Sequence, residues 1–454
     1  MWNQFFFNYM TKRTTSKAKI HLRPAEELVP REDWFSFFIK VSEDVHKDLG
    51  TTSFSNGYRH DDATYWAVLV YCALNGRATQ AGSDELNDRL YEQMGKPRQC
   101  IDQTRRRYKR LAPNAQQVNQ FLRKIPADVL EKFQVAFIKA QLFRALDLGL
   151  ITKVVEVYID FHKIDYYGKD RRETNAGITN VNDGRGTNRA RKYGEVMISS
   201  GLVSLFAGAE LSKQGAGKEA WIGKLLLMLR FWGFTIKRVY GDREFSTYDV
   251  LALLDIIDVP YTGSMKKTQG IRDLIDNYID GKCKSVAYHV LHPNQYVRLN
   301  VGSIPVHVIL KIDKGTSIHA LRKAFDEGTM TRAKIREKIH VFITTEQEPA
   351  DSSKLVRWGH DLIEGFRRRW RIESGFRDSK YFQPMSHARS NAIKSFRVGL
   401  GNYGYNGWRI QSAMYKRLQN VPASWRQGET RERFITVATT VHVKSNVAHG
   451  ASIA

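Results

Sequence analysis

Three acidic residues of this chain stand where a strongly basic protein has little reason to place them. Asp160 and Asp242 end apolar, β-branched runs, V-V-E-V-Y-I-D and R-V-Y-G-D, that predict buried strands. Glu373 lies in R-W-R-I-E-S-G-F-R, which has the pattern of a basic helix. Carboxylates in such surroundings cost free energy unless a cation balances them. The three positions therefore predict a metal site.

The charge of the chain indicates its class of partner. The 454 residues include 71 Lys and Arg against 47 Asp and Glu, a formal net charge of +24. Such a field attracts polyanions. The longest apolar stretch, near Leu225–Leu229, is too short to cross a bilayer, and no basic amphipathic anchor stands out. We therefore predict a nucleic-acid partner and no membrane.

The cysteines and the N-terminus bear on the compartment. Cys72, Cys100 and Cys283 are few, odd in number and widely spaced, which predicts neither a disulfide framework nor a zinc site. The first residues, M-W-N-Q-F-F-F, do not have the pattern of a signal peptide. Both observations favour the cytoplasm.

The pattern of elements changes after Gly149 and predicts an α/β protein with five segments. Residues 1–148 form a mainly helical N-terminal domain, for DNA binding or dimerisation, although an ordinary helical bundle explains the pattern equally well. Residues 149–264 form the first part of a core, and 265–336 form a β-rich insertion. Residues 337–400 complete the core with the Glu-bearing helix, and 401–454 form a C-terminal helix and tail.

The local patterns also set expected boundaries. One long helix is predicted from Ser353 to Phe382, ended by Pro384, and a second from Asn391 to Leu418. The polar, Gly- and Asn-rich residues 169–194 predict a long loop or mobile hairpin. Apolar runs predict the strands Val154–Phe161, Val196–Ser199, Leu202–Phe206, Ile236–Tyr240, Val259–Gly263 and Ile339–Thr344.

Three carboxylates on such a core suit phosphodiester chemistry. Cutting or transferring a phosphodiester needs a deprotonated oxygen nucleophile and stabilisation of charge on the phosphate, and two divalent metals supply both. Mg²⁺ prefers a few carboxylates plus phosphate oxygens, so we expect two Mg²⁺ or Mn²⁺ ions. Residues 354–397 contain eleven basic and four acidic residues, which favours contacts with a phosphate backbone beside the acids.

These motifs resemble those of a known family. F-R-R-R-W-R-I-E-S-G-F-R-D-S-K resembles the Y-x-x-R-x-x-x-E-x-x-x-x-x-x-K signature of DDE transposases of prokaryotic insertion sequences, with Phe366, Arg369, Glu373 and Lys380 at its four positions. Y-I-D-F-H-K-I-D-Y-Y-G and Y-G-D-R-E-F look like that family's two Asp motifs. The resemblance covers about residues 150–400. Phe366 departs from the signature, because it lacks the hydroxyl that the family's Tyr can give to a phosphate.

The resemblance implies an RNase H-like catalytic core and a catalytic, metal-binding triad of Asp160, Asp242 and Glu373. It implies a transposase that cleaves transposon ends and joins the 3′-OH to target DNA. The partners would be double-stranded DNA and a second copy of the chain in a synaptic complex, associated with the nucleoid. The expected DNA contacts are Arg243, Arg368, Arg369, Arg371, Arg377 and Lys380.

Several alternatives remain open at the level of sequence. Asp165 competes with Asp160 for the first acidic position, although it follows the break in the strand pattern. His162 is either a metal ligand or proton shuttle or, by a wider margin, a surface or satisfied histidine. An RNase H-like structure-specific nuclease without strand transfer, or an inactive DNA-binding derivative, would share most of these features.

Overall fold

The computed structural model describes residues 34–50, 53–55, 58, 60–95, 100–102, 107–108, 110–167, 177–180, 186–200, 203–213, 215–384, 390–418 and 434. The described part of the N-terminal third is mainly helical, and the first 33 residues lie outside it. Its elements are α3 (Trp34–Asp48), α4 (Asp62–Leu74), α5 (Thr79–Gln93), β1 (Cys100–Asp102), β2 (Arg107–Tyr108), α6 (Ala115–Lys124) and α7 (Ala127–Asp147).

The rest of the chain is built on one mixed sheet. Its first elements are β3 (Val154–Asp165), β4 (Ile178–Asn180), β5 (Arg189–Ser200), β6 (Val203–Leu211), α8 (Lys218–Phe231), β7 (Thr235–Gly241), α9 (Tyr248–Ile256) and β8 (Tyr261–Ser264). They are followed by α10 (Gln269–Ile279), β9 (Val286–Leu291), β10 (Ile304–Ile312), α11 (Ile318–Asp326), α12 (Arg332–Glu337) and β11 (Ile339–Thr344). The last are η2 (Ser352–Lys354), α13 (Leu355–Arg367), α14 (Trp370–Ser379) and α15 (Asn391–Leu418).

Within the described residues, nine strands form this sheet, in the order β4-β5-β3-β7-β8-β11-β10-β9, and β6 also pairs with β5. The pairs β6–β5 and β5–β3 are antiparallel, whereas β3–β7 and β7–β8 are parallel. The two parallel steps require crossover connections, which α8 and α9 provide. The molecule is therefore mixed α/β, as the order of sequence patterns predicted.

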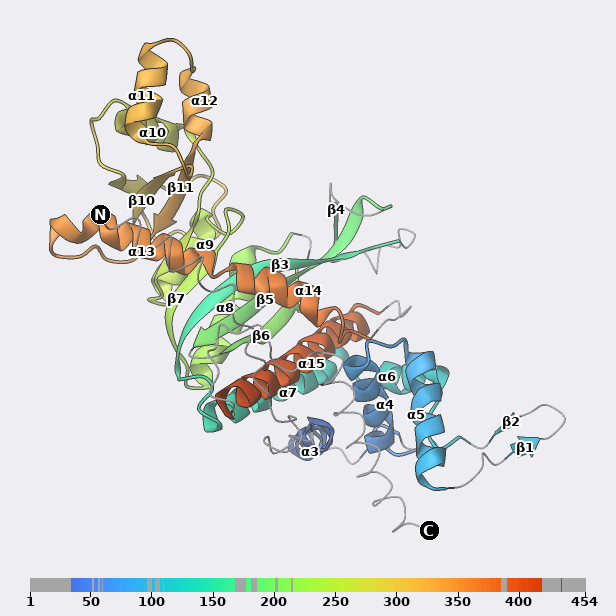
Figure 1. Cartoon of the computed structure of the whole chain (residues 1–454). Helices are drawn as coiled ribbons and strands as arrows, with labels where there is room; N and C mark the ends of the chain where they lie inside the picture. The colour runs from blue at the N-terminus through green and yellow to red at the C-terminus, as the bar shows by residue number, and fades with distance from the viewer. Residues whose placement is uncertain are drawn as a thin grey trace.

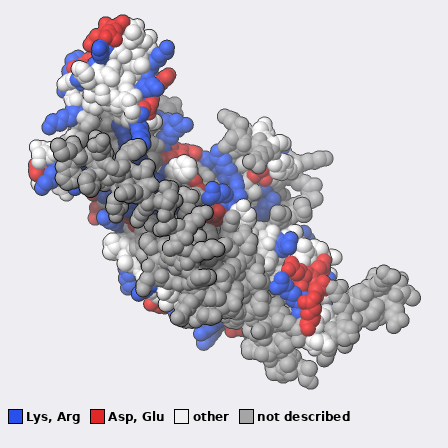
Figure 2. Space-filling view, in the orientation of Figure 1, with Lys and Arg blue, Asp and Glu red and all other residues white. Residues whose placement is uncertain are grey.

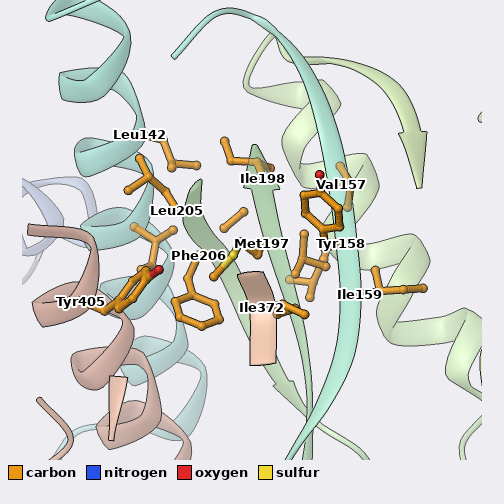
Figure 3. Packing of buried hydrophobic residues seen from close by; sticks show 14 of the residues in the cluster. Leu142, Val157, Tyr158, Ile159, Met197, Ile198, Leu205, Phe206, Ile372 and Tyr405 are labelled. Carbon is orange, nitrogen blue, oxygen red and sulfur yellow. The ribbon is translucent and has the colours of Figure 1, made fainter. Parts of the chain in front are cut away.

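Helices cover both faces of the sheet (Figure 1). On one face α8 packs against β5, β6 and β7, and on the other α14 lies on β3 while α15 and α7 lie on β6. Figure 3 shows the second interface, where Ile372 of α14 and Tyr405 of α15 point toward Met197 and Phe206 on the sheet. Alternate residues of a strand face opposite sides, so this packing fixes which side chains of β3 lie under α14.

Two predictions need correction. The single helix expected from Ser353 to Phe382 is two helices, because α13 ends at Arg367 and α14 begins at Trp370. The segment 265–336 is not β-rich: it holds α10, α11 and α12 as well as two strands. Those strands, β9 and β10, extend the main sheet through β11, and the helices form a lobe at the end of the molecule far from α3–α6 (Figure 1).

The polar segment 169–194, predicted to be a long loop or a mobile hairpin, contains an antiparallel strand pair as in the hairpin alternative. Its described residues include β4 and the first half of β5, which pair with each other and with the end of β3. The remaining residues of this segment, 169–176 and 181–185, lie outside the described part of the chain.

Across the described residues, no helix is long and apolar enough to span a membrane.

Candidate active site

Asp160 lies inside β3, not at its end. The strand continues for five residues beyond it, because residues 161–165 keep pairing with residues 190–194 of β5. Burial keeps the Asp160 side chain only 14% exposed. Asp165, the competing acid, is five positions further along and so faces the other side of the sheet. The register of β3 thus places Asp160, and not Asp165, under α14.

One guanidinium joins two of the three predicted acids. Arg369 donates from Nη1 to Oδ2 of Asp160 at 2.5 Å and from Nη2 to Oε1 of Glu373 at 2.6 Å. Asp160 and Glu373 come from β3 and α14, which are more than 200 residues apart in sequence. The Arg369 side chain is only 13% exposed, whereas that of Glu373 is 42% exposed. The fold therefore brings these two carboxylates to opposite edges of a single cation.

Asp242 comes directly after β7, the parallel neighbour of β3. Its Oδ1 accepts a hydrogen bond from the backbone N–H of Glu244 at 2.7 Å, a local turn that fixes the carboxylate. The pKa of Asp160 is raised to about 6, chiefly by burial and also by the negative charges of Asp242 and Glu373, in spite of the lowering effects of Arg369 and the Phe161 N–H. Both other predicted acids therefore act electrostatically on Asp160.

Three features of the sequence fix the position of α14. A Cβ on Gly375 would lie 2.5 Å from Cε of Met197 and 3.0 Å from Cζ of Phe206, so glycine lets α14 lie against the sheet without displacing these side chains. Phe366, at the departure from the family signature, lies under Arg369, with the guanidinium carbon 5.6 Å from the ring centre. Glu373 falls in the first turn of α14, where a negative charge is favoured by the helix dipole.

The donor chemistry fits hard divalent cations. Asp160, Asp242 and Glu373 offer only carboxylate oxygens, which Mg²⁺ prefers. The raised pKa of Asp160 comes chiefly from burial, to which the charges of Asp242 and Glu373 add and which Arg369 opposes. No group of three or more His, Cys, Asp or Glu side chains among the described residues is arranged to hold a metal ion, and the Arg369 guanidinium lies between two of the acids.

The other residues predicted to contact DNA differ in their surroundings. Arg368 donates to Glu156 at 3.4 Å, and Arg371 donates to the hydroxyl of Ser199 at 2.8 Å. Arg243, Arg377 and Lys380 are exposed, and Arg377 pairs with its neighbour Asp378. Lys and Arg side chains gather where α14 crosses the sheet (Figure 2). DNA contact at these six positions stays a prediction.

Two lysines near Asp242 were not found from the sequence. Lys192 of β5 and Lys218 of α8 both pair with Glu244. Lys192 is one of several basic residues in R-A-R-K-Y and Lys218 belongs to no motif, so no local pattern marks either lysine. Only the packing of α8 on the sheet brings them to Glu244.

His162 is a core histidine held through Nδ1, and its buried Nε2 has no hydrogen-bond partner among the described residues. Its side chain is 3% exposed, and Nδ1 lies 2.8 Å from Oε1 of the fully buried Glu195. The other oxygen of Glu195 accepts a hydrogen bond from Asn402 of α15 at 3.0 Å. The ring also stacks on Phe376 of α14, with centroids 5.1 Å apart. This cluster fastens both covering helices to the sheet.

No protein-family model matches the sequence, and no curated protein matches it. Among solved structures, the chain is similar to a cryo-EM structure of the piggyBac transposase synaptic complex with hairpin DNA. The likeness covers 92% of this chain and 79% of that chain, at 10% identity and a TM-score of 0.46. A similarity of this degree does not identify a function, which has to rest on the geometry of the site.

Proposed function

We propose that this chain is a DDE-type DNA transposase that cleaves DNA at transposon ends and joins the 3′-OH to target DNA. One observation carries the proposal: β3 and α14 place Asp160 and Glu373 on the same guanidinium, and Asp242 acts on Asp160 from the neighbouring strand. These are the three acids that the sequence motifs single out.

We also propose that the sheet from β6 to β8 is an RNase H-like core. The support is its construction: three antiparallel strands, β3, β5 and β6, followed by two parallel strands joined through α8 and α9. Asp160 on the central strand β3 and Asp242 directly after β7 lie on neighbouring parallel strands. Rigid strands of this kind hold catalytic groups with the accuracy that the chemistry needs.

Asp160, Asp242 and Glu373 would hold the two Mg²⁺ or Mn²⁺ ions, and Arg369 would exchange its carboxylate partners for phosphate oxygens. When bound, such ions promote deprotonation of the attacking hydroxyl and offset charge on the phosphate. The chain's own contribution is to fix the three carboxylates and to exclude water on the β3 side, where Asp160 is largely buried. Exposed Arg377 and Lys380 would bind the DNA backbone.

The partners follow from the same proposal. Double-stranded DNA, both transposon end and target, would lie along α14, and a second copy of the chain would complete the synaptic complex. The high positive charge, +24, supports a nucleic-acid partner. In a bacterial or archaeal cell the protein would work in the cytoplasm, on the nucleoid.

The test is incubation with DNA that carries the element's own ends, in Mg²⁺ or Mn²⁺, with cleavage and joining scored on a gel. The proposal expects both products and requires their loss in Glu373→Gln. Cleavage without joining would favour a structure-specific nuclease. Binding without cleavage, under conditions where the protein is folded, would favour an inactive DNA-binding derivative.

A further inference from the structure

A group of four lysines surrounds Glu244 on the α8 side of the sheet. Lys192 and Lys218 pair with its carboxylate, the second at 3.7 Å, and the charge of Lys163 also acts on it. Lys266, which follows β8, acts on Lys218. These four side chains come from four separate elements, β3, β5, α8 and the segment after β8, so their gathering is a property of the fold.

The register of the sheet places two of these lysines where their charges repel each other unless an anion is bound. Lys163 of β3 and Lys192 of β5 are directly opposite each other in the antiparallel pair. Like charges in this position destabilise a sheet by roughly 0.2–1 kcal/mol. Lys192 also lies over the ring of Phe161, 3.8 Å from its centre, which holds it on this face. A functional reason for such a pair is the binding of an anion.

The carboxylates nearby do not balance these charges. Among the described residues, Glu244 is the one acid that an ion pair joins to Lys192 and Lys218, and Asp242 acts on Lys218 from the site. Burial lowers the pKa of Lys218, and the charges of Lys192 and Lys266 lower it further, in spite of Glu244 and Asp242. Lys192, Lys218 and Lys266 carry three positive charges against the two negative charges of Glu244 and Asp242, an excess that a polyanion can neutralise.

The group lies on the opposite side of the sheet from α14. Lys163 is three residues from Asp160 on β3, an odd number, so the two side chains face opposite sides. Phe161, on the same side as Lys163, packs against Trp221 of α8. The site carboxylates therefore lie between two basic surfaces, one formed by α14 and one formed by the four lysines.

We propose that Lys163, Lys192, Lys218 and Lys266 form a second phosphate-binding surface, which holds the DNA backbone on the α8 side of the site while α14 holds it on the other side. This inference rests on the proposed function, since it names how that function's DNA partner is held. It makes the duplex pass over the edge of the sheet, across the ends of β3 and β7. The lysines contact phosphates and not bases, so their contribution is independent of DNA sequence.

The test measures DNA binding without catalysis. Fluorescence anisotropy with a labelled duplex in EDTA, between about 50 and 200 mM salt, gives the slope of log affinity against log salt. We expect Lys192→Ala with Lys218→Ala to weaken binding and to lower the slope by about 1.8 units, because each phosphate contact contributes about 0.9. Lys163→Ala with Lys266→Ala tests the same surface at exposed positions without removing a partner of Glu244.

The matched control is Lys224→Ala. Lys224 is on the same helix as Lys218 but is paired with Glu131 and Glu210, so its loss should leave the slope unchanged. Unchanged slopes in both double variants would overturn the second surface, even if the wild-type chain cleaves and joins DNA. A lowered slope in a protein that never cleaves DNA would support the surface and contradict the catalytic function.

Discussion

Two carboxylates that lie directly opposite each other in the sheet have opposite surroundings. Asp160 of β3 and Glu195 of β5 are register partners, so their side chains lie on the same face. Glu195 is fully buried, and its two oxygens have His162 and Asn402 as partners. Asp160 is partly exposed, shares one arginine with Glu373, and has the charges of Asp242 and Glu373 acting on it.

The difference separates a structural carboxylate from a functional one. Around Glu195 each oxygen has a hydrogen-bond partner on an element that needs to be fastened, so the group stabilises the packing of α14 and α15. Around Asp160 burial raises the pKa of the carboxyl group, the charges of Asp242 and Glu373 add to the rise, and Arg369 opposes it. A carboxyl group whose pKa is shifted by burial and by nearby charges marks a candidate functional site.

The largest expected effect concerns catalysis at the Asp160 side of this comparison. Asp160→Asn and Asp242→Asn should each lower cleavage of transposon-end DNA by about 10⁴-fold or more, since each removes a charge that the metal ions require. Asn keeps the shape of Asp, and affinity comes mainly from Lys and Arg, so DNA binding should remain. Single-turnover cleavage and anisotropy on the same preparations check both points. Turnover near the wild-type rate would remove that acid from the site.

The second prediction concerns stability at the Glu195 side. Glu195→Ala should lower the free energy of unfolding by about 3–5 kcal/mol, because it leaves His162 and Asn402 buried without their partner. Asp160→Asn, the matched variant across the strand pair, should leave stability unchanged or higher at pH 7, since it removes uncompensated charge. Urea unfolding followed by circular dichroism measures both, and equal losses would end the distinction between the two carboxylates.

A third carboxylate, Asp62 of the N-terminal helices, shows how hydrogen bonds can outweigh the effect of burial on a pKa. Burial alone raises its pKa, but His46, the Phe54 and Ser55 N–H groups and Ser53 outweigh burial, and the net pKa falls below the ordinary 3.8. Its folded-state pKa is depressed, so its contribution is fully present above pH 3.8 and is lost as the pH falls below that value.

Asp62→Asn should therefore lower the free energy of unfolding by about 2 kcal/mol at pH 7, a charge-assisted hydrogen bond being worth about 1.5–3 kcal/mol. The loss should shrink as the pH falls below 3.8, because Asp62 of the unfolded wild-type chain then takes up a proton that the folded protein does not. Urea titrations across pH 3–7 test this, with Asp44→Asn on the exposed side of α3 as the control. A loss that stays constant with pH would contradict the depressed pKa.

The smallest predicted effect concerns Arg369 and Lys380. If each binds a phosphate, Arg369→Ala and Lys380→Ala should each lower the salt-dependence slope for transposon-end DNA by about one unit. The two now differ in their surroundings, because Lys380 is exposed whereas Arg369 pairs with Asp160 and Glu373. If Arg369→Ala leaves the slope unchanged but lowers the melting temperature, Arg369 only forms ion pairs that stabilise the protein and does not bind a phosphate.

The sequence alone predicted the elements that follow from local periodicity. The helix predicted from Asn391 to Leu418 has the bounds of α15, and the run Ile339–Thr344 is β11. The predicted start of β3 is also correct, but its end is not, because residues 162–165 are held in the strand by pairing with β5 and not by their own pattern. No single segment of the sequence could predict which strands lie under α14.

The sequence by itself determined which acids to examine, because catalytic motifs keep fixed residue types at nearly fixed spacing. Only the tertiary structure decided that Arg369 lies between Asp160 and Glu373, that the predicted long helix breaks before this arginine, and that Glu195 is structural. It also decided that Lys163 faces Lys192. The physical reason is that charge balance depends on distance in space, and strand register and helix packing set that distance between segments far apart in the chain.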